Sequence, residues 1–282
     1  MNFNLLQSMN LRKNHQIVGF VLVFFFFFGI EAQQSVTHDK TAVTTYANSA
    51  FKPGEFLKFR IHFGVINAGF ATLKLTSEKR NGQDLYHAVG KGWTTGAAKM
   101  FYVVHDTYES YFTKGNIKPI FHKRRVDEDG YLIRRDKYFD YETNTVTVDD
   151  LQKNTKKTYP INNVQDMVSA IYYLRNLDIV NIKEGSEATV NMFFDGESFP
   201  FKLKFVKRET INTKFGKVKT WRVQPMVQKG RVFENQESLT LWVTDDANKI
   251  PIRIKASLVV GSLKADLDAF SGLANSFPVV VD

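Results

Sequence analysis

Apolar and polar residues alternate with a period of two through most of this chain, and no other feature constrains its fold as strongly. In Leu57–Phe63 every second residue is apolar, and the residues between them are basic. Successive side chains of a β-strand point to opposite faces, so this pattern indicates a strand with one buried and one exposed face. The alternation recurs along the chain, which predicts a mainly β fold of antiparallel strands.

Three dipeptides mark where the chain should reverse between such strands. They are Asn81-Gly82, Asp129-Gly130 and Asp195-Gly196, and each lies between two alternating segments. Asn-Gly and Asp-Gly favour two-residue hairpin turns, because both residues of such a turn adopt a positive φ. We therefore expect a β-hairpin at each position.

One segment replaces the period of two with a spacing of three and four. The apolar residues of this segment, Asn163–Asn176, are Val164, Met167, Val168, Ile171, Tyr172 and Leu174. Such spacing is typical of an amphipathic helix, and either Asn162 or Asn163 would cap it by accepting an early backbone N–H. We predict one helix here and a second, short helical turn at Gly96–Tyr102.

The first 32 residues are typical of a secretory signal peptide. Arg12 and Lys13 precede the apolar run Ile17–Ile30, which as a helix would span about 21 Å, less than the ~30 Å hydrocarbon core of a bilayer. Ala32 offers a small residue for cleavage, and Met1 and Met9 are alternative starts. A short uncleaved anchor is the other interpretation of this run.

After the signal peptide at 1–32, we expect a flexible tail at 33–48, a single β-rich domain at 49–269 and a C-terminal extension at 270–282. No linker rich in proline or serine and no internal repeat divides the body of the chain. Because of the signal peptide, we expect the chain to be exported, with no transmembrane helix once the leader is removed.

The composition limits the available chemistry. The chain has no cysteine, which excludes disulfides, thiolate metal sites, thiol catalysis and a lipid anchor on cysteine. Its formal charge is +9, and an exported protein rarely meets nucleic acid. The expected acidic partners are therefore lipid phosphates, anionic glycans or an acidic protein surface, with no nucleic acid and no cofactor.

Two groups of basic residues are candidates for binding such an anionic partner. The first lies on the hairpin His122–Lys137 and the second on the strand after Asp195-Gly196. The candidates are Lys123, Arg124, Arg125, Arg134 and Arg135 in the first group, and Lys202 and Lys204 in the second. Cross-strand ion pairs are the alternative explanation for these charges. If both groups share a face, they would attract an anionic headgroup or an acidic protein.

Four segments carry a resemblance to a known family. They are Phe51–Phe59, Gly64–Gly69, the Asp-x-aromatic-x-Ser segment within His105–Phe112, and Gln165–Arg175. In these segments the chain resembles exported bacterial proteins of the domain of unknown function 3108 family, over roughly residues 50–267. The last segment is the most specific, and its helix and core signature residues are Gln165, Asp166, Ser169, Tyr172 and Arg175.

The resemblance implies both a fold and a compartment. Members are typically periplasmic proteins of Gram-negative bacteria, and the phenylalanine-rich leader is similar to those common in Bacteroidota. The implied fold is a strongly curved antiparallel sheet, a half-barrel, packed around one amphipathic helix and similar to the half-barrels of lipoprotein carriers. The family carries no catalytic residues to transfer, and the basic hairpin His122–Lys137 departs from its pattern.

The sequence holds few candidates for catalysis or metal binding. It lacks a Gly-x-Ser-x-Gly elbow, a His-Glu-x-x-His motif and a phosphate-binding loop. The residues that could serve an enzyme are His62, His105, Asp106 and Glu109, and His62 and His87 could meet across strands around a metal. Neighbours on a strand point to opposite faces, so we expect structural roles for His105 and Asp106. The pairs Asp149-Asp150 and Asp245-Asp246 are typical of turns.

Two classes of function remain open. The first is a non-catalytic periplasmic envelope factor that binds a lipid, an acyl group or a segment of an outer-membrane protein. It includes an accessory subunit of an outer-membrane assembly or export machine, located at the outer membrane. The second is an enzyme that acts on envelope glycans or lipids. We expect the first, because export and a curved sheet favour a binding role and the sequence shows no catalytic motif.

Overall fold

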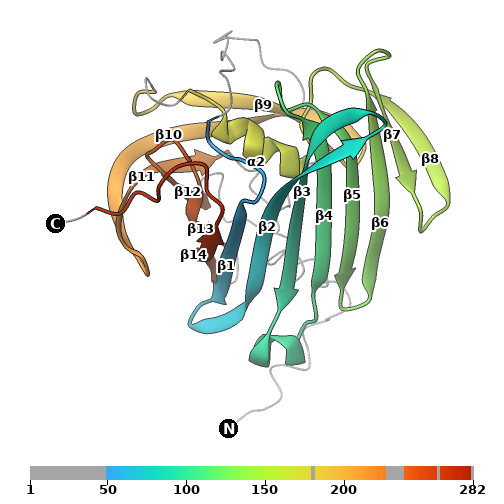
Figure 1. Ribbon diagram of the computed structural model, residues 1–282. Helices are drawn as coiled ribbons and strands as arrows, with labels where there is room; N and C mark the ends of the chain where they lie inside the picture. Colours follow the sequence, from blue (N-terminus) through green and yellow to red (C-terminus); the bar gives the residue numbers. More distant parts are fainter. Residues whose placement is uncertain (1–48, 179–181, 227–237, 259–260, 281–282) are drawn as a thin grey trace.

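The chain forms one antiparallel sheet and one α-helix in the computed structural model, which describes residues 49–178, 182–226, 238–258 and 261–280 (Figure 1). The predicted signal peptide and the tail at 33–48 lie outside these ranges. The sheet has 14 strands and is not closed into a barrel. None of the helices in the described ranges is long and apolar enough to cross a membrane.

The elements follow one another along the chain in the order given below. Before the α-helix they are β1 (Phe56–Phe63), β2 (Ile66–Arg80), β3 (Gln83–Thr94), the 3₁₀ helix η4 (Gly96–Met100), β4 (His105–Thr113), β5 (Pro119–Glu128), β6 (Tyr131–Asp140), β7 (Thr145–Asp150) and β8 (Thr155–Pro160). The helix α2 (Met167–Arg175) is followed by β9 (Glu187–Phe194), β10 (Glu197–Thr213), β11 (Gly216–Pro225), β12 (Leu239–Thr244), β13 (Pro251–Ser257) and β14 (Ser262–Ser271).

Two meanders share the middle of the sheet. From β1 the chain adds neighbours outward to β8 at one edge, and it then crosses to β9 at the other edge. From there it returns strand by strand to β14, which pairs with β1. The first and last strands are therefore hydrogen-bonded neighbours, and the segment containing α2 connects the two edges.

That connection requires the sheet to curl. Pro160 ends β8, and Gln165 already forms a parallel bridge with Met192 of β9. Five residues of extended chain reach about 17 Å, whereas a flat sheet of this many strands would be roughly 60 Å wide. The two edges must therefore approach each other, and Figure 1 shows α2 inside the resulting curve. The predicted half-barrel around one helix is confirmed.

All three predicted hairpin turns are confirmed. In the turn between β5 and β6, Asp129 and Gly130 have φ values of 50° and 87°, and Glu128 pairs with Tyr131 on either side. The turns at Asn81-Gly82 and Asp195-Gly196 also have a positive φ at both residues and the same two-residue length. The turn residues thus fix the register of the strands on both sides.

The prediction of where α2 begins was wrong. The helix starts at Met167 and not near Asn163, because Asp166 is its N-cap and accepts hydrogen bonds from the backbone N–H groups of Val168 and Ser169. Before it, Asn163 has a positive φ of 46° and Gln165 is bridged to β9, so neither residue is helical. The short helical turn expected near Gly96 is present as η4.

The two edge strands differ in what covers them. β9 is bridged by Gln165. β8 is exposed along most of its length, with Lys156 and Lys157 facing solvent and Pro160 at its end. Next to this edge a small apolar cluster joins the two ends of the sheet, with Phe139, Val146, Ile161 and Val164 packed on Phe193 of β9.

A buried ion pair attaches the end of α2 to the start of β1. Arg175 donates to both carboxylate oxygens of Glu55 over 2.6 and 2.7 Å, and to the carbonyl oxygens of Ala50 and Asn248. The side chains of Arg175 and Glu55 are 3% and 1% exposed. A pair this deeply buried stabilises the fold only while both charges are present.

Replacing Arg175 with Met should destabilise the protein by about 3–5 kcal/mol, because it leaves the Glu55 carboxylate buried without a cation. Urea denaturation at neutral pH measures the change. The double variant with Glu55→Gln should recover part of that loss, since no charge is then buried. A single variant as stable as the parent would contradict the assignment.

Candidate functional site

Aromatic side chains fill the concave face on one side of α2. Tyr172 of the helix lies between Phe51 and Phe112, with ring centroids 4.8 and 5.3 Å away. Tyr86 of β3 lies against the same Phe51 and Phe112 rings. This part of the interior, under β3 and β4, is closed by the protein's own core.

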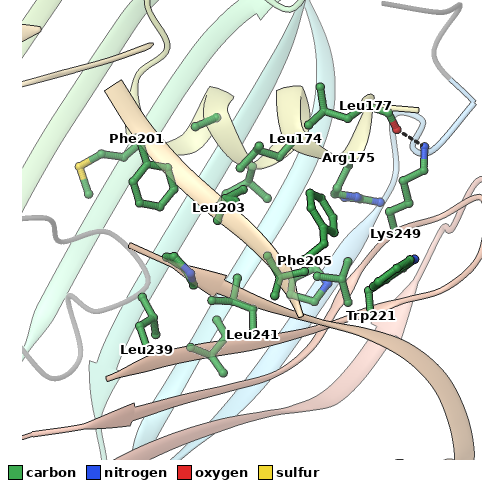
Figure 2. Close-up of a pocket in the computed structure, with 18 of the residues that line it drawn as sticks. Leu174, Arg175, Leu177, Phe201, Leu203, Phe205, Trp221, Leu239, Leu241 and Lys249 are labelled. Atoms are coloured by element: carbon green, nitrogen blue, oxygen red, sulfur yellow. Dashed lines mark hydrogen bonds between the residues drawn. The ribbon is translucent and has the colours of Figure 1, made fainter. Parts of the chain in front are cut away.

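On the other side of α2 the packing leaves an apolar cavity. It lies between the helix and strands β9–β13 and has a volume of about 170 Å³ (Figure 2). Its lining consists of Phe59, Leu73, Met167, Ala170, Ile171, Leu174, Arg175, Leu177, Met192, Phe201, Leu203, Phe205, Trp221, Val223, Pro225, Leu239, Leu241, Val243, Lys249, Pro251 and Ile254. A space of this size with a mainly apolar lining suits an apolar ligand.

The alternation of β10 and β12 creates this lining. On β10, Phe201, Leu203 and Phe205 point into the cavity, while the lysines between them point away. On β12, Leu239 and Leu241 do the same. The helix contributes Ala170, whose small side chain leaves room that a larger residue would fill.

Two cationic side chains lie at the margin of the cavity, and their states differ. Arg175 is neutralised by Glu55. The Lys249 ammonium donates to the Leu177 carbonyl oxygen over 2.8 Å, as the dashed line in Figure 2 shows. Burial lowers the pKa of Lys249 although the charge of Asp178 opposes that shift. In the lining, the Trp221 indole N–H has no acceptor among the described residues.

The predicted basic residues do not share one face. Arg124 and Arg135 point into the half-barrel, where both donate to Asp195 in the β9–β10 turn, over 3.0 and 2.9 Å. The outward-facing residues are Lys123, which pairs with Glu109, Arg125, which pairs with Asp136, Arg134 on β6, and Lys202 and Lys204 on β10. Their binding of an anionic partner stays a prediction, although several of these charges are used in ion pairs.

The helix signature residues hold α2 on the sheet. Asp166 and Ser169 form a reciprocal capping box, and Asp166 also accepts a 2.5 Å hydrogen bond from Ser110 of β4. Gln165 donates to the Ile117 carbonyl oxygen over 2.8 Å. With Tyr172 and Arg175, these residues are all buried, so their role in this structure is to place the helix beside the cavity.

A buried carboxyl pair is the feature that sequence reasoning missed. Asp106 of β4 and Glu128 at the end of β5 are both buried, beside Arg124. Burial raises the pKa of both carboxyl groups, and the charge of Glu128 raises that of Asp106 further. Asp106 is on the inner face and His105 on the outer, as expected.

Because the folded state holds protons on this pair at pH values where the unfolded chain has released them, stability should fall as pH rises from about 4.5 towards neutrality and beyond. Asp106→Asn should flatten that slope. Urea denaturation at a series of pH values tests this, with the exposed Asp127→Asn as the matched control. An unchanged slope in Asp106→Asn would show that the pair does not titrate in this way.

Lys137 of β6 is a second buried group with unusual surroundings. Its side chain is 1% exposed, and its ammonium has no hydrogen-bond acceptor in the described part of the chain. It lies 5.5 and 5.3 Å from the ring centroids of Phe193 and Phe194. Burial lowers its pKa to about 8. Neighbouring His122 is also buried, and burial together with the Lys137 charge lowers the His122 pKa.

Lys137→Met should leave the protein as stable at pH 7 or stabilise it by about 1–3 kcal/mol, since it removes a buried donor without an acceptor. The unfolded chain binds more protons than the folded protein between pH 8 and pH 10.5, so parental stability should rise across that range. The variant should lose this rise, whereas the exposed Lys157→Met should keep it. A strongly destabilised Lys137→Met would show that the ammonium has an essential partner.

The residues nominated for catalysis are not brought together. Glu109 lies on the outer face, where it contacts His87 over 3.0 Å, and His105 is exposed at the start of β4. His62 and His87 do not meet. His62 pairs with Asn67 near the start of β2, whereas His87 pairs with Thr76 near its other end. Within the described residues no three His, Asp or Glu side chains could hold a metal ion.

A second pocket, of about 420 Å³, is polar. It is lined by Asn116, Lys118, Tyr141, Asn144, Asn162, Asn163 and Tyr173. Neither this pocket nor the apolar cavity is lined by Asp106 or Glu128.

A family model matches most of the β-sheet domain. The sequence profile described as "Protein of unknown function (DUF3108)" matches residues 58–268. The chain belongs to this family. The match extends from β1 to β14, so the DUF3108 domain comprises both meanders and the helix. No curated protein matches the sequence.

The fold of this DUF3108 protein is also similar to that of a solved structure. A beta-barrel-like protein of the domain of unknown function DUF1849 from Brucella abortus matches with a TM-score of 0.51 and 8% identity, covering 78% of this chain and 97% of the other. A candidate lipoprotein from Parabacteroides distasonis matches with a TM-score of 0.34 and 12% identity, covering 80% of this chain and 99% of the other. Of these two scores only the first indicates a shared fold.

Proposed function

We propose that this protein is a non-catalytic factor of the bacterial envelope that binds the acyl chain of a lipid in the cavity between α2 and strands β9–β13. The observation that carries the proposal is the cavity itself. Among the described residues that line it, all except Arg175 and Lys249 are apolar. Such a space offers few hydrogen-bonding groups to a polar substrate.

The energetics favour a hydrocarbon chain. Each buried methylene contributes about 0.8 kcal/mol, so about six of them supply roughly 5 kcal/mol. Lys249 lies at the margin with two ammonium hydrogens beyond the one given to Leu177. A carboxylate or phosphate at the end of the chain would accept these donors.

A binding role is supported by the scattering of the residues nominated for catalysis. Asp106 faces inward, while Glu109 and His105 face outward. An envelope location is supported by the predicted signal peptide, and family resemblance implies the periplasm. A segment of an outer-membrane protein would use the same apolar surface and is the alternative occupant for the experiment to separate. It would suit a role of this protein as an accessory subunit of an outer-membrane assembly or export machine.

The test uses displacement of a fluorescent fatty acid, cis-parinaric acid, by palmitate. The protein should bind the probe with micromolar affinity, and Ala170→Leu should weaken binding at least tenfold because the added carbons occupy the cavity. Ala97→Leu makes the same change on exposed η4 and should bind like the parent. Circular dichroism confirms folding of each variant. Absence of probe binding by the parent, or equal binding by a folded Ala170→Leu, would reject the proposal and leave the protein-segment alternative.

A further inference from the structure

Large apolar side chains are exposed at the end of the half-barrel opposite α2. Val65 in the β1–β2 turn is 98% exposed, and Met100 and Phe101 after β3 are each 84% exposed. Ile66 and Phe63, on either side of the β1–β2 turn, are 51% and 38% exposed. Side chains this exposed contribute little to the core. Where they gather on one surface, they mark a site of interaction with a protein or a membrane.

These five residues lie on neighbouring segments. β2 pairs with β3 up to Gly69 and Thr94, and just beyond that pair the Thr95 N–H donates to the Ala68 carbonyl oxygen over 3.0 Å. The β1–β2 turn and η4 therefore project side by side, at the lower end of the sheet in Figure 1. We call this surface the apolar rim.

Lysines and acidic residues lie at different edges of the apolar rim. Lys99 is exposed beside Met100. Lys264 of β14, which pairs across strands with His62 of β1, forms an ion pair with Asp266 over 2.9 Å. The sequence has no aspartate or glutamate from position 56 to 77 or from 85 to 105. The acidic turn of Asp127 and Asp129 adjoins the apolar rim on the side of Phe101, since the Asp129 N–H donates to the Val103 carbonyl oxygen.

We propose that the apolar rim inserts into the interface of an anionic lipid bilayer. The apolar side chains sit on two projecting turns and not on a flat face, so they can enter the acyl region while the strands stay outside. Lysines at the edge of such a surface are attracted by acidic lipid headgroups. This surface lies at the opposite end of the sheet from α2 and extends the proposed function from holding a lipid to docking on a membrane.

Vesicle co-sedimentation tests the proposal with the chain from Gln33 onward, which lacks the predicted signal peptide. Vesicles of phosphatidylethanolamine and phosphatidylglycerol should bind the protein at least tenfold more tightly than vesicles of phosphatidylcholine. The triple variant Val65→Ser, Met100→Ser, Phe101→Ser should lose at least tenfold in affinity for the anionic vesicles. Lys99→Gln should lose about threefold.

The control places the same kind of change at the acidic turn. Tyr131→Ser with Leu132→Ser removes two exposed apolar side chains there and should stay within twofold of the parent. Ala170→Leu, which fills the cavity, should also keep vesicle binding. A parent that ignores anionic vesicles, a folded triple variant that binds like the parent, or a loss of vesicle binding in Ala170→Leu would each overturn the assignment.

Insertion has its own signature. Phe101→Trp should show a blue shift of indole emission with anionic vesicles and quenching by brominated acyl chains, relative to the parent with its native tryptophans. Unchanged emission despite binding would place the protein on headgroups alone and overturn insertion.

Discussion

The pairing of the first strand with the last determines the rest of this structure. Because β1 and β14 are hydrogen-bonded neighbours, two meanders become one sheet, and its two edges belong to β8 and β9. The chain then passes from one edge to the other in a few residues, which is compatible only with a curled sheet. Curvature, interior and helix position all follow from this connection. α2 occupies the interior because it lies within the segment that crosses it.

The concave face is divided chemically. Under β4–β6 it carries charged and polar groups, including Arg124 and Lys137, and the turn residue Asp195 closes over them from the far edge. Under β10–β13 it is apolar and leaves the cavity. The proposed acyl ligand belongs to the second half, and the charges of the first half help to hold the edges of the sheet together.

Much of the fold was predictable from the sequence because local chemistry determined it. The Asn-Gly and Asp-Gly turns and the alternation of segments such as Leu57–Phe63 specify hairpins without reference to distant residues. The start of α2 was not predictable in this way, since the long-range bridge of Gln165 keeps the chain extended until Asp166 caps the helix.

The candidate site was harder to predict. Alternation on β10 identifies Phe201, Leu203 and Phe205 as inward-facing, but whether inward side chains meet or leave a space depends on their packing against α2. The buried carboxyl pair was missed because Asp106 and Glu128 are distant in sequence and meet only after β4 pairs with β5. The apolar residue Val126 was a usable signal for this pair. Alternation from Val126 along β5 places Arg124 and Glu128 on the same buried face.

The exposed strand β8 has a consequence for association between molecules. An open sheet can recruit a strand from another chain at any edge whose backbone groups are free, and this route leads to fibres. Here the lysines at 156 and 157 repel an identical neighbour, and the proline at 160 lacks an N–H to offer it. These residues oppose polymerisation of the open sheet through that edge.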